Sequence, residues 1–331
     1  MSKTNYMKAV VQENEGDKLE IKEVPIPVPG PGEVLVKMDY SPINPSDLSL
    51  VQGTYAIKTG YPLVPGIEGS GRVIDAGKGL IGKIRIGKRV ACTSAQNRGG
   101  TWAEYMVTSA YRVIPLNRTI EDMQGSMLLV NPLTAAAFVE IAKKKGHRTI
   151  VNNAAASALG KMLIYLCKKN DLELINIVRR EDQIKTLRGL KAEYILSSDS
   201  PDFEKELGFI ANKMNARLFF DAVGGNQTVI MLKLSPPGST IIPYAKLSET
   251  NISIDPRLLI QQNKKLEGFY LGHYTSGKSV LENIKTINRM KSLMSNGLAI
   301  KISSVYLLEN INKALQQYRN NMSSGKVLIQ I

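Results

Sequence analysis

The sequence predicts an α/β protein that combines a β-rich region with a doubly wound parallel sheet. In the N-terminal third of the chain, short apolar stretches are separated by Gly and Pro turns, which is typical of antiparallel strands. From about residue 131 onward, apolar strands alternate with segments in which apolar residues recur every three or four positions, as in helices that cover a parallel sheet. With 331 residues and 43% apolar content, the chain can bury a full core and is expected to form two domains.

The β-rich region is expected to form a partly closed antiparallel barrel. Its clearest strands are residues 7–11, 33–37, 71–74 and 89–92. Prolines at every second position from Pro25 to Pro31 exclude a helix and predict an extended connector. Residues 300–331 return to β character and end in a predicted strand at residues 326–331, so we expect this tail to rejoin the first domain.

The second region is expected to contain six parallel strands joined by right-handed crossovers. The strands are predicted at residues 149–151, 174–178, 193–196, 216–221, 238–242 and 266–271, with a helix over 201–215. Six strands match the two halves of a Rossmann domain. The expected boundaries are therefore residues 1–118 with 296–331 for the β-rich substrate domain and residues 119–295 for the dinucleotide-binding domain.

The stretch after the first of these strands is typical of a nucleotide-binding turn. One face of the helix that follows carries Leu159, Met162, Leu163, Leu166 and Cys167. The N-terminus of such a helix presents free N–H groups and a partial positive charge to a pyrophosphate. Of the G-x-G-x-x-G fingerprint only Gly160 is present, but Ala155, Ala156 and Ser157 are small enough for a phosphate to approach the backbone. Alone, this motif fits an ordinary α/β unit equally well.

Two arginines, Arg179 and Arg180, follow the second strand of this region. An NAD-specific site usually carries Asp or Glu at this distance from the turn, to bind the ribose 2′-hydroxyl. A guanidinium group instead suits a 2′-phosphate, to which it can donate two parallel hydrogen bonds. A solvated strand end is the alternative interpretation, but the position favours NADPH as the cofactor.

Cysteine and histidine usage predicts neither a disulfide framework nor a metal site. Cys92 and Cys167 are the only cysteines, and His147 and His273 are the only histidines. Two histidines exclude a three-His zinc site, and a Cys/His/Cys site would use almost every candidate ligand. We therefore expect no metal.

Composition also indicates the cellular location and the kinds of partner to expect. No apolar run reaches membrane-spanning length, and the N-terminus carries neither a signal-peptide hydrophobic region nor an arginine-rich leader. We expect a cytoplasmic protein without a membrane partner. The net charge of +14 would attract polyanions, but the lysines are spread over predicted helix surfaces and not gathered into a stripe. Solubility is therefore the first interpretation of the charge, attraction of anionic cofactors and thioesters the second, and nucleic acid is not expected.

Eight short motifs occur in a characteristic order over essentially the whole chain. They are Pro-Gly-Pro-Gly-Glu-Val (29–34), Asn-Pro-Ser-Asp (44–47), Pro-Gly-Ile-Glu-Gly-Ser-Gly (65–71), Gly-Lys-Arg-Val (87–90), Gly-Gly-Thr-Trp-Ala-Glu-Tyr (99–105), Asn-Pro-Leu-Thr-Ala (131–135), Asp-Ala-Val-Gly-Gly (221–225) and Ser-Gly-Lys-Val (324–327). Each is a weak match alone, but in this order they resemble the medium-chain dehydrogenase/reductase superfamily. The resemblance implies a Rossmann domain and a GroES-like substrate domain.

The departures from this family indicate its zinc-independent branch. Zinc-dependent alcohol dehydrogenases of the superfamily carry Cys where Asn44 stands and His where Ile67 stands, and at most Cys92 remains of their four-cysteine lobe. The zinc-independent branch includes quinone reductases, enone reductases and 2-enoyl thioester reductases. Residues 41–55 resemble the enoyl thioester reductases in particular, and this resemblance implies that Tyr55 is the proton donor.

The resemblance also implies a set of cofactor residues. They are Asn131 and Thr134 near the nicotinamide, Val223 and Gly224 beside its ribose, Ala155, Ala156 and Ser157 at the pyrophosphate, and Arg179, Arg180 and Lys326 at the 2′-phosphate. Thr134 could equally be a buried helix residue that bonds its own backbone.

Without a metal, hydride transfer to an isolated carbonyl lacks a Lewis acid, whereas reduction of a C=C bond conjugated to a carbonyl needs only hydrogen-bond donors. Tyr55 could donate to the carbonyl oxygen or protonate the α-carbon, and Asn44 could orient the substrate or the nicotinamide. Alternatively, Tyr55 only covers the barrel mouth, and Asn44 is a turn residue before Pro45.

The predicted function is therefore NADPH-dependent reduction of a small-molecule 2-enoyl thioester or enone. An NADPH:quinone oxidoreductase without a dedicated proton donor is the alternative within the family. From another class, the fold could persist as a non-catalytic RNA-binding protein, although Arg179, Arg180 and residues 221–225 favour an enzyme. We also expect a homodimer, by resemblance and because the sixth strand would otherwise leave an open apolar edge.

Overall fold

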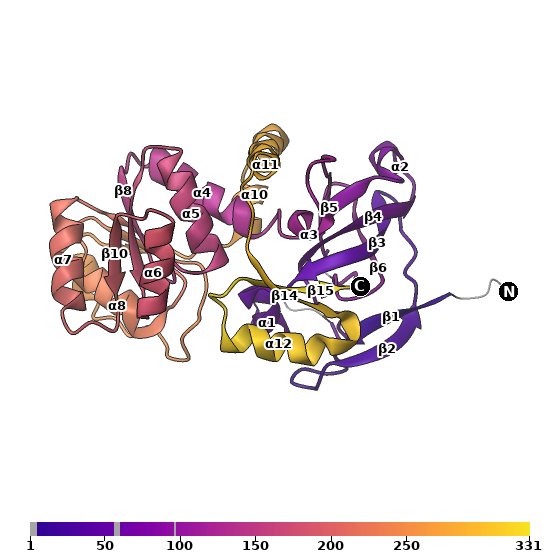
Figure 1. Cartoon of the computed structure of the whole chain (residues 1–331), viewed down its shortest axis with the longest axis horizontal. Coiled ribbons are helices and arrows are strands. Elements are labelled where there is room, and N and C mark those ends of the chain that lie inside the picture. Colours follow the sequence, from indigo (N-terminus) through magenta and orange to yellow (C-terminus); the bar gives the residue numbers. More distant parts are fainter. Residues whose placement is uncertain (1–4, 56–59, 96) are drawn as a thin grey trace. The chain divides into compact units, whose positions relative to one another are not determined.

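The computed structural model describes residues 5–55, 60–95 and 97–331, which divide into two compact units (Figure 1). The first unit is Met1–Val130 with Ile287–Ile331, and the second is Asn131–Thr286. From the sequence, the boundaries are expected at 118/119 and 295/296. The difference arises because the short helix α3 (Asp122–Gly125) packs on strands of the first unit and because α11 (Val280–Ser295) runs across the second boundary. The expectation that the N-terminus carries no leader rests in part on the first four residues, which lie outside the described part.

The first unit is built mainly of antiparallel strands. Strands β1 (Tyr6–Val11) and β2 (Glu20–Pro25) form a two-stranded sheet. The larger sheet contains β3 (Glu33–Pro42), β4 (Glu68–Ala76), β5 (Arg89–Thr93), β6 (Tyr105–Ser109), β7 (Val113–Pro115), β14 (Ile302–Leu307) and β15 (Lys326–Gln330). Its order is β14-β15-β3-β4-β5-β7, with β6 paired to β3.

The C-terminal tail is part of this first unit. Strand β15 pairs antiparallel with β3, with Leu328 opposite Pro42, so the last strand of the chain lies beside one of the first (Figure 1). The helices of this unit are α1 (Pro45–Val51), α2 (Leu80–Arg85), α3, the short 3-10 helix η1 (Leu308–Asn310) and α12 (Ile311–Asn320). The core beneath α12 contains Val10, Ile43, Trp102, Leu315 and Ile329, each almost fully buried.

The second unit contains a six-stranded parallel sheet in the order β10-β9-β8-β11-β12-β13. The strands are β8 (Thr149–Asn152), β9 (Glu173–Val178), β10 (Tyr194–Ser197), β11 (Leu218–Asp221), β12 (Thr240–Pro243) and β13 (Lys265–Leu266). Numbered along the chain, this is the order 3-2-1-4-5-6 of a Rossmann domain. The predicted α/β fold class, with a Rossmann unit and a separate β-rich unit, is confirmed.

The sixth strand is shorter than the sequence predicts. Residues 266–271 were expected as a strand, but β13 covers only Lys265–Leu266, and the helix α10 (Leu271–Ser276) begins at the last of these residues. Glu267 N and Phe269 N still donate to Ile241 O (3.0 Å) and Pro243 O (2.9 Å), so the edge remains hydrogen-bonded to β12 beyond the strand. Apolar residues alone cannot distinguish a paired strand from such an extended connection.

Helices connect the strands of the second unit. They are α4 (Asn131–Lys144), α5 (Ala158–Lys168), α6 (Glu181–Gly189), α7 (Phe203–Lys213), α8 (Gly225–Leu234), α9 (Arg257–Ile260) and α10. Those from α4 to α8 each contain buried apolar residues. Phe138 of α4 stacks on Phe220 of β11 with ring centroids 3.9 Å apart, and it meets Tyr244 and Phe269 edge-on. This aromatic group fixes α4 against the middle of the sheet.

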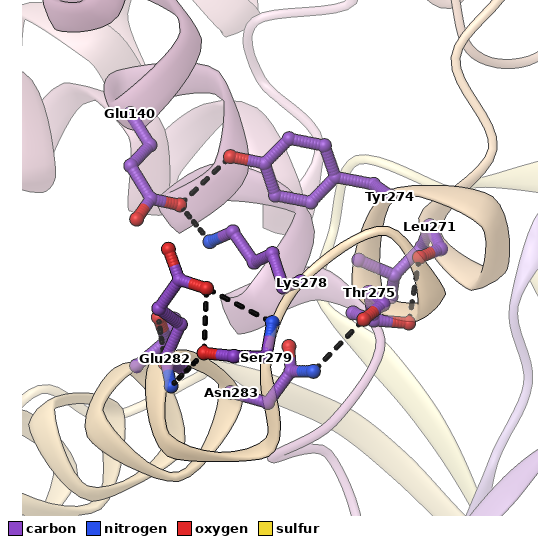
Figure 2. A network of polar contacts seen from close by, with 9 residues as sticks. Glu140, Leu271, Tyr274, Thr275, Lys278, Ser279, Glu282 and Asn283 are labelled. Carbon is purple, nitrogen blue, oxygen red and sulfur yellow. Dashed lines mark hydrogen bonds and ion pairs between the residues drawn. The ribbon is translucent and has the colours of Figure 1, made fainter.

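A polar network joins α10 and the start of α11 to α4 (Figure 2). Glu140 of α4 accepts hydrogen bonds from Tyr274 (2.8 Å) and Lys278, whose Nζ lies 4.6 Å from the centroid of the Tyr274 ring. Ser279 and Glu282 form a reciprocal N-terminal cap on α11, in which Ser279 N donates to Glu282 Oε2 at 2.9 Å and Glu282 N to Ser279 Oγ at 3.3 Å. The network therefore fixes the position of α10 relative to α4 within this unit.

Gly160 allows α5 to pack against the turn that precedes it. A Cβ atom at this position would lie 2.3 Å from Ala155 O, a distance that requires the backbone to move. We predict that Gly160→Ala lowers the free energy of unfolding by about 1–3 kcal/mol, as overpacking does. The matched control is Gly189→Ala at the end of α6, where a Cβ meets no atom within 4 Å. Urea denaturation should show a larger loss of unfolding free energy for Gly160→Ala than for Gly189→Ala. Equal losses would contradict a role for the close packing at Gly160.

Candidate active site

The turn between β8 and α5 has the geometry of a phosphate-binding turn. Ala154 has φ +48°, in the left-handed region that L-residues rarely adopt. Ala155 and Ala156 are almost fully buried. Ser157 is the N-cap of α5, and its Oγ accepts a hydrogen bond from Gly160 N at 3.1 Å. Small side chains and a capped helix N-terminus leave room for a phosphate near the backbone, so the predicted pyrophosphate residues fit that group.

Asp221, at the end of β11, organises the loop that contains the predicted ribose residues. Its Oδ1 accepts hydrogen bonds from Val223 N (2.9 Å) and Gly224 N (3.0 Å), and its Oδ2 accepts one from Thr228 Oγ1. The carboxylate is fully buried. Gly224 has φ +78°, which favours glycine.

Asn153 connects this loop to the turn after β8. Its Nδ2 donates to Asp221 Oδ1 (2.6 Å) and to Gln227 Oε1 (2.8 Å), while its Oδ1 accepts from Ala222 N (2.6 Å). Asn153 is itself fully buried. The amide is thus bonded on both sides, and the two loops form one rigid polar structure.

The structure brings three of the predicted cofactor segments to the same edge of the parallel sheet. Ala155 N donates to Ile177 O of β9 at 3.1 Å, and Asn153 N donates to Phe220 O of β11 at 3.2 Å. The segments that follow β8, β9 and β11 therefore lie side by side at the carboxyl ends of adjacent strands. In doubly wound sheets this switch point is where dinucleotides bind.

The two arginines after β9 differ in their surroundings. Both side chains are exposed, but Arg180 Nε donates to Asp182 Oδ1 at 3.1 Å, within the first turn of α6. Gln183 Oε1 accepts from both backbone N–H groups, at 2.9 Å from Arg179 and 3.2 Å from Arg180. Because Asp182 neutralises part of the charge of Arg180, Arg179 is the better candidate for a phosphate contact.

Two further predicted cofactor residues lie on α4 of the second unit. Asn131 is the first residue of this helix and is half-buried, and Thr134 lies one turn later with 6% of its surface exposed. The stacking of Phe138 on Phe220 holds this helix on β11. These contacts position α4 but assign no function to Asn131 or Thr134.

In the first unit, Asn44 lies between two opposite buried charges. Its Oδ1 accepts a hydrogen bond from Lys326 Nζ, and its Nδ2 donates to Glu68 Oε1 at 3.0 Å. Asn44 N donates to Asp47 Oδ2 at 2.7 Å. The exposed fractions are 1% for Asn44, 0% for Asp47, 1% for Glu68 and 2% for Lys326. We refer to these four residues as the buried charge cluster.

The cluster is also bonded to the surrounding backbone. Glu68 Oε2 accepts from Leu129 N (3.1 Å) and Val130 N (2.9 Å), and Lys326 Nζ donates to Ile43 O at 3.4 Å. Burial raises the pKa of Glu68 and lowers that of Lys326, while the attraction between their charges opposes both shifts. Burial also raises the pKa of Asp47 to about 7, against the lowering effect of its backbone hydrogen bonds and of Lys326.

Tyr55 follows the C-terminal end of α1. Its backbone N–H and that of Thr54 both donate to Ser49 O, at 3.1 Å and 2.9 Å. The Tyr55 side chain is half-buried. Since α1 begins at the buried charge cluster and ends at this turn, the cluster and Tyr55 lie at opposite ends of one short helix.

Two expectations about the first unit are changed by these contacts. The amide of Asn44 was expected to orient substrate or nicotinamide, but it is 1% exposed and bonded to Lys326 and Glu68. Lys326 was expected at a 2′-phosphate, but its Nζ is buried and its hydrogen bonds go to Asn44 and the Ile43 carbonyl. Lys326 is therefore not among the residues proposed below to hold the cofactor.

Four residues of these networks received no role from the sequence. They are Asp47, Glu68, Asn153 and Asp221. Sequence signals exist for two of them. Asp47 stands three residues after Asn44, the spacing of a helix N-terminal capping box, and Glu68 is a carboxylate followed by the three small residues 69–71.

Within residues 5–55, 60–95 and 97–331, no three Cys, His, Asp or Glu side chains lie close enough together to hold a metal ion. Cys92 and Cys167 are buried and free. In the same part of the chain, no helix is long and apolar enough to span a membrane.

Comparison with known proteins supports this architecture. A family model described as the alcohol dehydrogenase GroES-like domain matches residues 30–118. The mitochondrial enoyl-[acyl-carrier-protein] reductase of Xenopus tropicalis is 30% identical over 334 residues, covering 97% of this chain and 95% of that protein. The human protein of the same name is 26% identical, covering 98% of this chain and 88% of that protein.

Solved structures show the same fold over the whole chain. A protein from Mesorhizobium loti, described as an NADPH:quinone reductase, superimposes with a TM-score of 0.92 at 31% identity and full coverage of both chains. A Bacillus thuringiensis protein with the same description gives 0.89 at 26% identity, covering 99% of this chain and all of the other. A mycobacterial protein solved in complex with NADPH gives 0.83 at 20% identity, covering 98% of this chain and 100% of the other, and shows the fold only.

A Rossmann unit with the switch-point loops in place, joined to a GroES-like unit, defines an NAD(P)-dependent oxidoreductase. The protein is a reductase of this kind. The chain belongs to the zinc-independent branch of the medium-chain dehydrogenase/reductase superfamily, as the sequence motifs predict.

The pKa of Asp47 makes the stability of the first unit depend on pH. Because its folded pKa of about 7 lies above the ordinary value of 3.8, its contribution to stability is complete below pH 4 and is lost as the pH rises to 7. We predict that Asp47→Asn, measured against the wild type by urea denaturation, gains about 1–3 kcal/mol in relative stability between pH 5 and pH 8. A difference that does not change with pH would contradict this assignment.

Proposed function

We propose that the protein reduces the C=C bond of a 2-enoyl thioester with NADPH, and that Tyr55 delivers the proton. The observation that carries this proposal is the similarity over 97% of the chain to proteins named enoyl-[acyl-carrier-protein] reductase. The second support is the position of Tyr55, half-buried at the end of a helix whose start is held by the buried charge cluster.

In this proposal the second unit holds the cofactor. Ala155, Ala156 and Ser157 receive the pyrophosphate at the N-terminus of α5, where the helix dipole and free N–H groups favour negative charge. The loop of Val223 and Gly224, fixed by Asp221 and Asn153, lines the nicotinamide ribose. Asn131 and Thr134 of α4 complete the nicotinamide side.

Specificity for NADPH is assigned to the arginines after β9, with Arg179 as the main contact. No acidic residue stands at the end of β9 to accept the ribose 2′-hydroxyl of NADH, because Arg179 and Arg180 follow Val178 directly. The acidic residues nearby, Glu181 and Asp182, belong to the first turn of α6, and Asp182 is already paired with Arg180.

A residue of the protein then supplies the proton. When bound, the cofactor supplies a hydride to the β-carbon of the conjugated double bond. The electron pair of that bond moves toward the thioester carbonyl, whose oxygen needs a hydrogen-bond donor. The Tyr55 hydroxyl releases its proton to the α-carbon and recovers one from water, so that the thioester gains one hydride and one proton in total.

Reduction of a quinone by the same hydride is the second candidate function. It is favoured by the Mesorhizobium loti structure, described as an NADPH:quinone reductase, which is 31% identical and covers the whole chain. A reduced quinone is a stabilised anion that water can protonate, so this reaction does not need Tyr55. The dependence on Tyr55 therefore separates the two candidates.

Because the protein is a reductase, the RNA-binding alternative is set aside. The cytoplasmic location is untested by the structure, and the names of the curated relatives place those proteins in mitochondria.

We also propose a homodimer, because β13 is the edge strand of the parallel sheet and Leu266 on it is 37% exposed. Pairing with a second copy would satisfy this edge. Light scattering at micromolar concentration should give the mass of a dimer, and a mass of about 36 kDa, that of one chain, would contradict it.

Arg179 should contribute more to NADPH affinity than Arg180. We predict that Arg179→Ala weakens NADPH binding by roughly tenfold or more, since a charge-assisted hydrogen bond contributes about 1.5–3 kcal/mol, while NADH binding stays the same. Arg180→Ala should have a smaller effect because Arg180 is paired with Asp182. Arg188→Ala, at the exposed C-terminal end of α6, is the control for a general loss of positive charge. Fluorescence titration measures the affinities of the wild type and the three variants for both cofactors. Equal losses of affinity for NADPH and NADH in Arg179→Ala would exclude a 2′-phosphate contact.

Tyr55→Phe removes the hydroxyl and keeps the ring. We predict that turnover of the best enoyl thioester falls at least about 100-fold, since positioned proton transfer contributes roughly 10²–10⁴-fold, with NADPH affinity unchanged. Tyr111→Phe, which changes a tyrosine that is 71% exposed in the same unit, is the control and should have wild-type turnover. If Tyr55→Phe loses less than about threefold while both proteins reduce quinones rapidly, the quinone-reductase function replaces the first candidate.

A further inference from the structure

The buried charge cluster of the first unit is part of neither the phosphate-binding loops nor the proton-transfer step. Its amide, carboxylates and ammonium group are 0–2% exposed, so none of them reaches a substrate directly. Burying such groups is unfavourable unless they are paired and fully hydrogen-bonded. A buried cluster of this kind is therefore weak evidence for a contribution to general stability.

The contacts of the cluster converge on one short segment. Lys326 of β15 and Glu68 of β4 bind the two ends of the Asn44 amide, and Asn44 is the N-cap of α1. The carboxylate of Asp47 in the first turn of α1 accepts the Asn44 N–H at 2.7 Å. The first turn of α1 is therefore bonded to two different strands of the sheet through charged groups.

Tyr55 follows the opposite end of α1, four residues after Val51. The helix has only seven residues, and the turn after it is closed by hydrogen bonds from Thr54 N and Tyr55 N to Ser49 O. A helix this short is not stable by itself and depends on its attachments. Its apolar attachment consists of the buried Leu48 and Leu50 and the partly buried Val51. At its C-terminal end, Val51 O accepts a hydrogen bond from the buried Gln12 Nε2 at 2.9 Å. The orientation of α1, and with it the place of Tyr55, is thus set by attachments at both ends, and those at the N-terminal end are made through charged groups.

We propose that Lys326 is a positioning residue of the reductase: its buried ammonium group, held with Glu68 on either side of the Asn44 amide, fixes α1 so that Tyr55 stands in one place. This proposal rests on the proposed role of Tyr55. In zinc-dependent members of the superfamily a cysteine stands where Asn44 stands. In this chain a cation supplied by the protein itself, the Lys326 ammonium, contacts the side chain at that position.

Lys326→Met removes the charge and keeps the length of the side chain. We expect kcat, on whichever acceptor the wild type reduces fastest, to fall at least about tenfold, because small misplacements of a reacting group have effects of this size or larger. The KM for NADPH should stay within about twofold, since the cofactor residues lie on other loops. Hydrogen exchange of the α1 amides should become at least about tenfold faster, while the strands of the first unit keep their protection.

The double variant Lys326→Met with Glu68→Gln distinguishes positioning from general stability. The double variant removes both opposite charges and leaves no buried charge uncompensated. If Lys326→Met lowers the hydrogen-exchange protection of the strands, the double variant should therefore restore that protection. The α1 amides should remain fast-exchanging and kcat should remain low. Lys264→Met is the control, because it removes a buried lysine of the second unit whose Nζ donates to Leu232 O (2.6 Å) and Lys233 O (3.2 Å). It should leave the α1 amides unchanged.

The outcomes separate this proposal from the proposed function. Hydrogen exchange of α1 reports on Lys326 whatever the substrate is, and Tyr55→Phe reports on the chemistry alone. If α1 exchanges as in the wild type, or if kcat of Lys326→Met is unchanged, Lys326 is not a positioning residue. If neither Lys326→Met nor the double variant folds, the cluster serves the stability of the whole unit, which also contradicts the proposal. If α1 loosens and kcat falls while Tyr55→Phe is fully active, the positioning role stands and the proton-donor role fails.

Discussion

The amide of Asn44 lies between a buried ammonium group and a buried carboxylate, and much of the first unit is arranged around this contact. Lys326 comes from the last strand, Glu68 from a central strand and Asn44 from the start of a helix, so two hydrogen bonds join the end of the chain to two elements of its first quarter. Each of the two charges is buried, so each depends on the other for compensation. The contact therefore requires the C-terminal tail to return to the first unit, where β15 pairs with β3.

The second unit contains a comparable buried hydrogen-bond network, in which neutral groups surround a single carboxylate. Asp221 accepts hydrogen bonds from two backbone N–H groups of its loop, and Asn153 ties that loop to the turn after β8. Both networks hold loops by side chains that never contact solvent. In each unit, the residues proposed to meet the cofactor or the substrate are held by neighbours that do not touch either, as accurate positioning requires.

The fold could be predicted from the sequence because its signals are local. The alternation of strands and helices after residue 131, and the Gly and Pro turns before it, gave the two architectures and most strand positions. The short sixth strand was missed because apolar residues 266–271 are compatible with both a strand and an extended edge. The contact between Asn44 and Lys326 could not be predicted, because these residues are 282 positions apart in the chain and meet only after folding. Motif resemblance marked both positions as important, but only the structure gave their partners.

The central claim is that the protein adds a hydride and a proton across the double bond of an enoyl thioester. It is tested most directly by incubating the protein with NADPH and crotonyl thioester in deuterated water and analysing the product by mass spectrometry. We predict a butyryl thioester that carries a single deuterium, located on the α-carbon, because the proton reaches that carbon from an exchangeable hydroxyl and the hydride reaches the β-carbon from the cofactor. Failure to form the saturated thioester, in a preparation that oxidises NADPH with a quinone, would contradict the account.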